Sequence, residues 1–259
     1  MAASAAASST TTAAELRASR RRLVGDSLGI IVSASGFGLV LGLAYRAAGF
    51  SPIEVGAMGV FVFAGAAQFA AVGYVVGGLS WLGIILLTAF LNSRHFLYAA
   101  ALAPYFAGAS RPVRAVAAHL LTDEAFALAI AHFRRIGRLD TWGYFWGAFV
   151  ATFIPWNVAT IVGSLVGGQI PDPSRFGLDI VFPCAMAGLA VGLITGRREV
   201  VAAITGAVVA VAVSLAWDPA AGILAGGLIG PLAGLAMPGP KGADEPPLSP
   251  MPLGGEDER

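Results

Sequence analysis

The chain has 259 residues, of which 57% are hydrophobic and 12% are charged, and its formal net charge is +1. A soluble domain carries about 25% charged residues, so this composition excludes an ordinary soluble fold, and the small net charge gives no sign of nucleic-acid binding. The single cysteine, Cys184, excludes an intrachain disulfide, and the three histidines do not have the spacing of metal ligands.

In chain order, residues 1–24 come first and are rich in Ala, Ser and Thr, which predicts a disordered tail. Its last part contains Arg20, Arg21 and Arg22, which we interpret as a basic cytoplasmic flank of the first membrane helix. Hydrophobic runs of roughly 18 or more residues predict membrane-spanning helices. Eight such runs follow, at residues 27–47, 54–77, 81–104, 115–133, 142–168, 178–196, 199–216 and 219–237.

The fourth run is the weakest, because Asp123 and Glu124 lie in its middle, so the count is seven or eight. With eight spans and a cytoplasmic N-terminus, most Arg residues fall in cytoplasmic segments, and both termini are then cytoplasmic. If residues 115–133 do not cross, Arg134, Arg135 and Arg138 move outside and this bias is lost. The final segment, 238–259, is acidic and rich in Pro and Gly, which predicts a second tail.

The predicted fold is therefore an all-α, polytopic bundle in the membrane, with residues 25–237 as one transmembrane transport domain. Small residues spaced for close helix packing recur along it, as in Gly38-x-x-x-Gly42 and Gly163-x-x-x-Gly167. The segments around these two motifs also resemble each other weakly, which suggests an internal repeat of the kind found in transporters.

Polar side chains inside the predicted spans are the most informative residues, because a charge at the bilayer centre costs at least about 2.5–3.5 kcal/mol. In Leu91-Asn92-Ser93-Arg94-His95 the guanidinium has two open interpretations. It binds the carboxylate of a substrate, with Asn92 on the other side of that substrate, or it pairs with Asp123 or Glu124 and locks two helices together. His95 either carries protons or, as we favour, forms a hydrogen bond across helices.

Two further stretches predict irregular helices. Four small residues precede Gln68, and Gly65 and Ala66 among them favour a helix break whose free backbone groups bind a zwitterion; the alternative is tight helix packing with Gln68 as a bridging side chain. Ile154-Pro-Trp-Asn157 places a proline inside a span, which frees a carbonyl group beside Asn157. The adjacent Asp123 and Glu124 require a proton, an arginine or an ion, or else a short interfacial segment.

These motifs together resemble the AzlC-type branched-chain amino acid permeases, the larger subunit of a bacterial two-component exporter. The resemblance covers about residues 25–235 and depends most on two blocks, Phe63-Ala-Gly-Ala-Ala-Gln-Phe69 and Leu91-Asn-Ser-Arg-His-Phe-Leu-Tyr98. Further matching segments are Gly25-Asp26, Gly36-Phe-Gly38, Gly49-Phe-Ser-Pro52, Leu121-Thr-Asp-Glu124 and Gly177-Leu-Asp179. The chain departs from the family at Met58-Gly59, where a serine is frequent, and this leaves details of selectivity open.

The resemblance implies an inner-membrane transporter of small neutral amino acids such as valine, leucine or isoleucine, usually outward, with a small AzlD-like membrane subunit. We expect the coupling ion to be the proton, and we expect no cofactor. The expected substrate-binding residues are Gly65, Ala66, Gln68, Asn92, Arg94 and Asn157, and the expected proton-coupling residues are His95, Asp123 and Glu124. The alternative function is a structural or receptor subunit that transports nothing. A membrane enzyme is disfavoured, because no catalytic motif is present, and a channel is disfavoured because no ring of like charges is visible.

Overall fold

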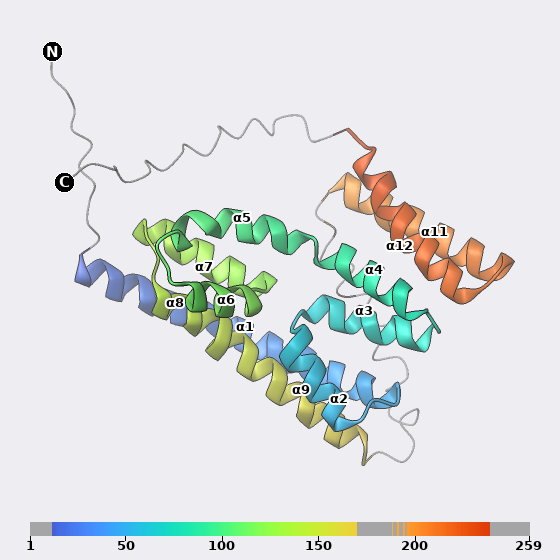
Figure 1. Cartoon of the computed structure of the whole chain (residues 1–259), viewed down its shortest axis with the longest axis horizontal. Coiled ribbons are helices and arrows are strands. Elements are labelled where there is room, and N and C mark those ends of the chain that lie inside the picture. The colour runs from blue at the N-terminus through green and yellow to red at the C-terminus, as the bar shows by residue number, and fades with distance from the viewer. Residues whose placement is uncertain (1–11, 170–187, 189–190, 192–193, 195, 239–259) are drawn as a thin grey trace. The chain divides into compact units, whose positions relative to one another are not determined.

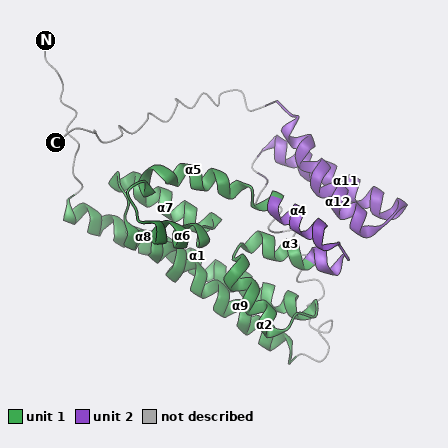
Figure 2. Ribbon diagram, viewed as in Figure 1, with its two compact units in different colours: residues 1–72, 90–186 green, residues 73–89, 187–259 purple. Residues whose placement is uncertain are grey.

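The computed structural model describes residues 12–169 and 196–238, together with the single positions 188, 191 and 194. Within these ranges every regular element is a helix (Figure 1). The chain divides into two compact units (Figure 2): unit 1 comprises residues 1–72 and 90–186, and unit 2 comprises residues 73–89 and 187–259. Each unit is described by itself below.

Helix α1, Ala13–Ala47, begins earlier than the sequence predicted. The hydroxyl of Thr12 accepts a hydrogen bond from the backbone N–H of Glu15, and the Glu15 carboxylate accepts one from the backbone N–H of Thr12. This capping box satisfies two amide groups that a helix N-terminus leaves free. Residues 13–24, expected in a disordered tail, are therefore part of helix α1, whereas the predicted tail at 238–259 lies almost entirely outside the described residues.

Unit 1 is organised around the pairing of α1 with α9, Ile154–Gly167. Two glycines permit this contact. A Cβ atom on Gly42 would lie 2.1 Å from the carbonyl oxygen of Thr160, and one on Gly163 would lie 2.2 Å from that of Leu39. Because backbone faces backbone here, any larger residue would force the helices apart. The small-residue motifs therefore act in packing, as predicted.

The other helices of unit 1 are individually short. They are α2 (Pro52–Ala57), the π-helical segment Met58–Val62, the first part of α3 (Gly65–Val76), α5 (Arg94–Phe106), α6 (Arg111–His119), α7 (Asp123–Ile136), α8 (Thr141–Phe145) and a second π-helical segment, Trp146–Phe153. The run predicted as a span at 115–133 is thus two short helices, α6 and α7, with a turn between them. By contrast, α8, the second π-helical segment and α9 continue one another over Thr141–Gly167, close to the predicted span 142–168.

Unit 2 contains the hairpin of α11, Arg197–Ala216, and α12, Pro219–Leu235. Its helices also approach through glycine: a Cβ atom on Gly226 would lie 2.5 Å from the carbonyl oxygen of Gly206. The first part of α4, Trp81–Asn92, packs on α12, where a Cβ atom on Gly227 would lie 3.1 Å from the Leu87 side chain. The predicted span 178–196 lies almost wholly outside the described residues.

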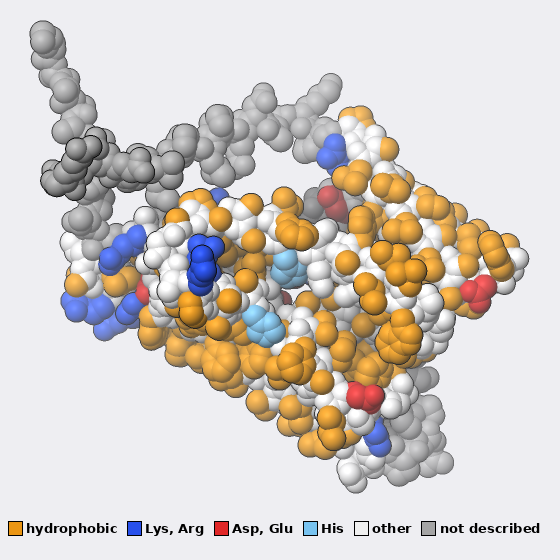
Figure 3. All heavy atoms as spheres, viewed as in Figure 1, with side chains coloured by type: hydrophobic (Ala, Val, Ile, Leu, Met, Phe, Trp, Pro, Cys, Tyr) orange, Lys and Arg blue, Asp and Glu red, His pale blue; other side chains and the backbone are white. Residues whose placement is uncertain are grey.

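Hydrophobic side chains cover much of the exposed surface of the described helices (Figure 3). Four stretches of helix are long and apolar enough to cross a membrane: Ala13–Ala47, Trp81–Phe106, Thr141–Gly167 and Arg197–Ala216. Shorter apolar helices lie at Pro52–Val62, Gly65–Val76 and Pro219–Leu235. The structure thus bears out an all-helical membrane fold, while the described residues do not establish a count of seven or eight spans.

Candidate functional site

The helix predicted over residues 54–77 is broken where the sequence suggested a break. The π-helical segment ends at Val62, and Phe63 has φ 27° and ψ 56°, a conformation that non-glycine residues rarely adopt. The helix resumes at Gly65, and its first regular backbone bond runs from the Gln68 N–H to the Ala64 carbonyl oxygen at 2.8 Å. Packing of the buried Phe63 ring against Phe153, with centroids 4.8 Å apart, holds the break.

Gln68 lies one turn beyond the break and is completely buried. The indole N–H of Trp156 donates a hydrogen bond to its side-chain oxygen at 2.8 Å, which joins α3 to α9. The side-chain nitrogen of Gln68 lies beside the buried hydroxyl of Tyr45 and interacts with it, and neither group has a further hydrogen-bond partner among the described residues. These two polar groups satisfy each other only in part within an apolar interior, where unmet hydrogen bonds cost free energy, so this location is suited to a polar ligand.

Two further residues, Gly65 and Asn157, lie close to the helix break and to Trp156. A Cβ atom on Gly65 would lie 2.9 Å from the Trp156 ring, so only glycine admits the indole here. Asn157 donates a hydrogen bond to the Phe153 carbonyl oxygen at 2.9 Å, just after the second π-helical segment. Its side-chain oxygen faces Gly59, whose added Cβ atom would lie 2.0 Å away. We call Gly59, Gly65, Gln68, Trp156 and Asn157 the break site.

The predicted residues Gly65, Gln68 and Asn157 therefore come together, and Ala66 lies in the same first turn of α3. The sequence did not single out Trp156 or Tyr45. Trp156 stands between Pro155 and Asn157, so the proline that drew attention to this span was an available signal. Tyr45 lies at the end of a predicted helix and offered none.

Arg94 and Asp123 form a second cluster, in which the guanidinium contacts the carboxylate at 2.9 Å between α5 and α7. The hydroxyl of Tyr98 donates to the other Asp123 oxygen at 2.6 Å. Asp123 belongs to the first turn of α7, capped by the Thr122 hydroxyl, where the helix dipole favours a carboxylate. The structure thus contains the predicted ion pair, and it places the acidic residues at a helix end and not in the middle of a span.

The remaining predicted residues surround this pair. His95 Nδ1 donates to the backbone carbonyl oxygen of Asn92 at 2.9 Å, within the α4–α5 turn, so the hydrogen bond across helices that we favoured for His95 is not what the structure has. The side-chain oxygen of Asn92 is buried without a hydrogen-bond partner, and Glu124 is exposed. In the described part of the chain, no hydrogen bond or ion pair connects the Arg94 cluster to the break site.

A third polar network, which the sequence did not reveal, joins α1 to the α7–α8 turn. His132 is completely buried between the Ser19 hydroxyl and the Asp140 carboxylate, each 2.9 Å from a ring nitrogen. Arg20 forms two hydrogen bonds to Asp140, and Arg135 donates to Ser19 at 3.2 Å. Arg20, expected in a basic cytoplasmic flank, is partly exposed and binds Asp140 at the edge of this network, and the side of the membrane on which it lies stays a prediction.

Asp140 is the best-defined charged group of this network. Burial raises the pKa of its carboxyl, but hydrogen bonds from Arg20 and His132 outweigh burial and lower the pKa to about 2. The carboxylate is consequently ionised at neutral pH, and it holds α1 and α7 together. Elsewhere among the described residues, no group of three His, Cys, Asp or Glu side chains is arranged to hold a metal ion.

Broken helices, buried polar clusters and apolar surfaces of membrane-spanning length define a polytopic helical membrane protein. The family model of the AzlC protein matches residues 29–170, more than half of the chain, and the chain belongs to this family of membrane permeases. The family predicted from the sequence motifs is confirmed.

Named relatives are membrane proteins as well. An uncharacterized membrane protein of Archaeoglobus fulgidus is 29% identical over 74% of this chain and 83% of its own length. The inner membrane protein YgaZ of Escherichia coli is 29% identical over 56% of this chain and 60% of its own length. An uncharacterized membrane protein of Helicobacter pylori is 29% identical over 55% of the chain. No solved structure matches the chain significantly.

Proposed function

We propose that the protein exports branched-chain, small neutral aliphatic amino acids across the bacterial inner membrane, coupled to protons. It would act with a small AzlD-like membrane subunit, and both of its termini would be cytoplasmic. Membership of a permease family supports the transport class. The break site is the observation that carries the proposal, because irregular backbone at membrane depth is tolerated only where protein buries it or a water-filled cavity adjoins it.

The break site offers complementary groups for a zwitterionic amino acid. The first amides of a helix have no partner within that helix, and they carry partial positive charge, so the start of α3 at Gly65 and Ala66 suits a carboxylate. The side-chain nitrogen of Gln68, which faces the Tyr45 hydroxyl, carries a second proton and adds a further donor. The side-chain oxygen of Asn157 would accept from the ammonium group, and the Phe63 and Trp156 rings would receive the aliphatic chain.

The Arg94 cluster supplies the proposed proton coupling. Protonation of Asp123 would remove the charge that holds Arg94, and Arg94 with Asn92 would then become available to a passing carboxylate. His95 and Glu124 lie beside this pair and would exchange protons with water. The proposed cycle therefore alternates between a closed ion pair and an opened one.

Export can be tested in a bacterial strain without its own branched-chain exporters, fed with leucine-containing dipeptides. Cells that express this chain with its small partner should retain less leucine than cells that carry an empty vector. The same cells with Gln68→Leu should retain as much leucine as the vector control when retention is normalised to the amount of protein in the membrane. Equal retention in all three strains would refute the proposed export.

A structural or receptor subunit is the second candidate, and the pairing of Arg94 with Asp123 favours it. An ion pair between two helices stabilises their contact whether or not anything is transported. In that case, Arg94→Ala would lower the amount of protein in the membrane, and the transport by each correctly folded molecule would not change. Measuring both quantities for this variant separates the two candidates.

A further inference from the structure

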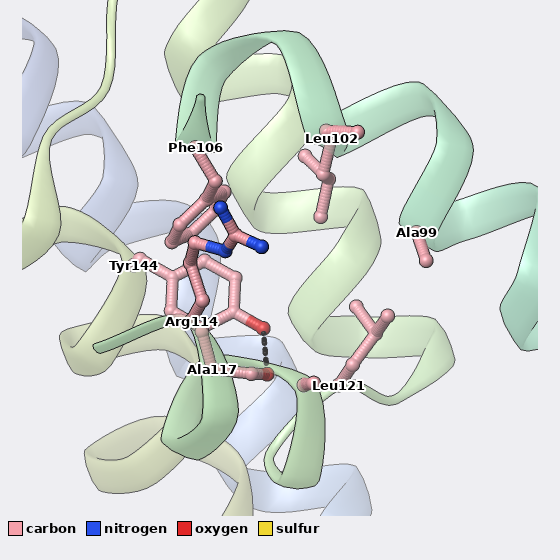
Figure 4. Close-up of a pocket in the computed structure, with 9 residues that line it drawn as sticks. Ala99, Leu102, Phe106, Arg114, Ala117, Leu121 and Tyr144 are labelled. Atoms are coloured by element: carbon pink, nitrogen blue, oxygen red, sulfur yellow. Dashed lines mark hydrogen bonds between the residues drawn. The ribbon is translucent and has the colours of Figure 1, made fainter. Parts of the chain in front are cut away.

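A pocket of about 190 Å³ lies in unit 1 between α5, α6 and α8, apart from the break site and the Arg94 cluster (Figure 4). Its walls are apolar, and the side chains of Leu102, Phe106, Leu121 and Tyr144 that form them are buried. The remaining small lining residues are Ala99, Ala103, Ala117 and Ala118. Alanines on facing helices leave the space open.

The polar groups of the pocket are few and differ in availability. The Tyr144 hydroxyl donates a hydrogen bond to the Ala117 carbonyl oxygen at 2.6 Å, the dashed line in Figure 4, so both groups are occupied with fixing α8 to α6. The guanidinium of Arg114 extends from α6 among the lining side chains, and it forms no hydrogen bond or ion pair with any described residue. The pocket thus combines an apolar interior with one available cation.

We propose that this pocket binds a small aliphatic carboxylate, with its hydrocarbon part between α5 and α8 and its carboxylate on Arg114. An apolar cavity of about 150 Å³ accommodates benzene, so this pocket holds roughly six to eight non-hydrogen atoms. No acidic side chain lines it, and nothing there recognises an ammonium group. The site therefore favours a simple acid, such as 4-methylpentanoate, over a zwitterionic amino acid of the same skeleton.

A guanidinium is the side chain best matched to a carboxylate, because it can donate two parallel hydrogen bonds. Arg111, one turn earlier on α6, is also exposed but does not line the pocket. The two arginines share a helix and differ in their access to the ligand. Arg111 is consequently the matched control for Arg114.

The test is a binding titration of 4-methylpentanoate with the purified full-length chain in detergent. The native chain should bind the acid, Arg114→Gln should weaken binding about tenfold or more, and Arg111→Gln should leave it unchanged. Ala99→Phe, which fills the pocket, should abolish binding. Unchanged affinity in both Arg114→Gln and Ala99→Phe, or no binding by the native chain, would overturn the proposal.

Three comparisons on the native chain need no variant. The neutral analogue 4-methylpentan-1-ol and the zwitterion leucine should each compete with the bound acid at least tenfold more weakly than the acid itself. Equal competition by the alcohol would refute the role of Arg114. Decanoate should bind no better than the short acid; tighter binding of decanoate would identify a groove for lipid acyl chains and would also overturn the proposal. None of these results depends on export through the break site.

Discussion

Trp156 donates its indole N–H to the side-chain oxygen of Gln68 at 2.8 Å, and this bond joins α9 to the first turns of α3. Gln68 is fully buried and Trp156 is 8% exposed, so neither group can turn to water if the other is removed. The pair therefore fixes the helix that begins after the break at Phe63. The hydrogen bond between Trp156 and Gln68 thus ties the α3 side of the break site to α9.

Gln68→Leu should lower the free energy of unfolding by about 1–3 kcal/mol, because it leaves the Trp156 N–H buried and unpaired. Trp156→Phe should also destabilise the chain, by removing the partner of Gln68. The double variant removes both polar groups and should recover part of this stability, yet it should not export leucine. Thermal unfolding in detergent and export in cells measure the two effects. A double variant that exports at the native rate would remove Gln68 from the proposed mechanism.

Gly65→Ala should impair export, because the added methyl group would lie 2.9 Å from the Trp156 ring and would displace it. Gly56→Ala is the matched control, since Gly56 lies in the short helix α2 and its added methyl group meets no atom within 4 Å. The control should be neutral or stabilising by up to about 1 kcal/mol. Leucine export, normalised to protein level, compares the two. Similar rates in both variants would show that the indole position does not matter for transport.

The Arg94–Asp123 pair distinguishes coupling from a purely structural role. Arg94→Asp and Asp123→Arg should each lower the protein level, because each leaves like charges close together between α5 and α7. Combining both changes restores an ion pair and should restore the protein level. If the pair takes part in transport, the exchanged pair should remain inactive in export. Full recovery of export would support the structural candidate.

Acid should weaken the Asp140 network in a defined pH window. A carboxyl with a lowered folded-state pKa stabilises the fold above its unfolded pKa, about 3.9, and that contribution is lost as pH falls through the folded value of about 2. Ionised Asp140 should thus add about 2 kcal/mol to the free energy of unfolding at neutral pH. This stabilisation should disappear as the pH falls from about 4 to about 2.

Asp140→Asn should accordingly lower the melting temperature at pH 7 and flatten its dependence on pH below about 4. Asp26→Asn is the control, because Asp26 is 58% exposed and lies 3.7 Å from Arg135. An exposed ion pair at that distance contributes little to stability. The free energy of unfolding of this variant should therefore lie within about 0.5 kcal/mol of that of the native chain. An equal loss of stability in Asp140→Asn and Asp26→Asn would contradict the role assigned to the buried network.

The sequence predicted the helical membrane fold from composition and from the length of its apolar runs. It offered the helix break near Gly65 and the pairing of Arg94 with Asp123 or Glu124 each as one of two alternatives, and the structure contains the break and the pair with Asp123. It did not locate the start of α1, although Thr12 and Glu15 have the local spacing of a capping box. It could not predict the contact of Arg20 with Asp140, which are far apart in the chain and meet only after folding.

The same limit applies to the functional clusters. Nothing local to Gln68 indicates that Trp156 lies against it, since only the pairing of helices brings the two together. Likewise, Asp123 and Glu124 looked costly while residues 115–133 were treated as one span. The turn before α7 places them at a capped helix end, where carboxylates are favoured.

Leucine efflux from proteoliposomes that contain the purified chain with its small partner tests the central proposal most directly. Vesicles preloaded with radiolabelled leucine should release it faster than protein-free vesicles, an opposing proton gradient should accelerate the release, and Gly65→Ala should slow it while Gly56→Ala does not. Release at the protein-free rate, with both proteins present and folded, would contradict amino acid transport through the broken helix.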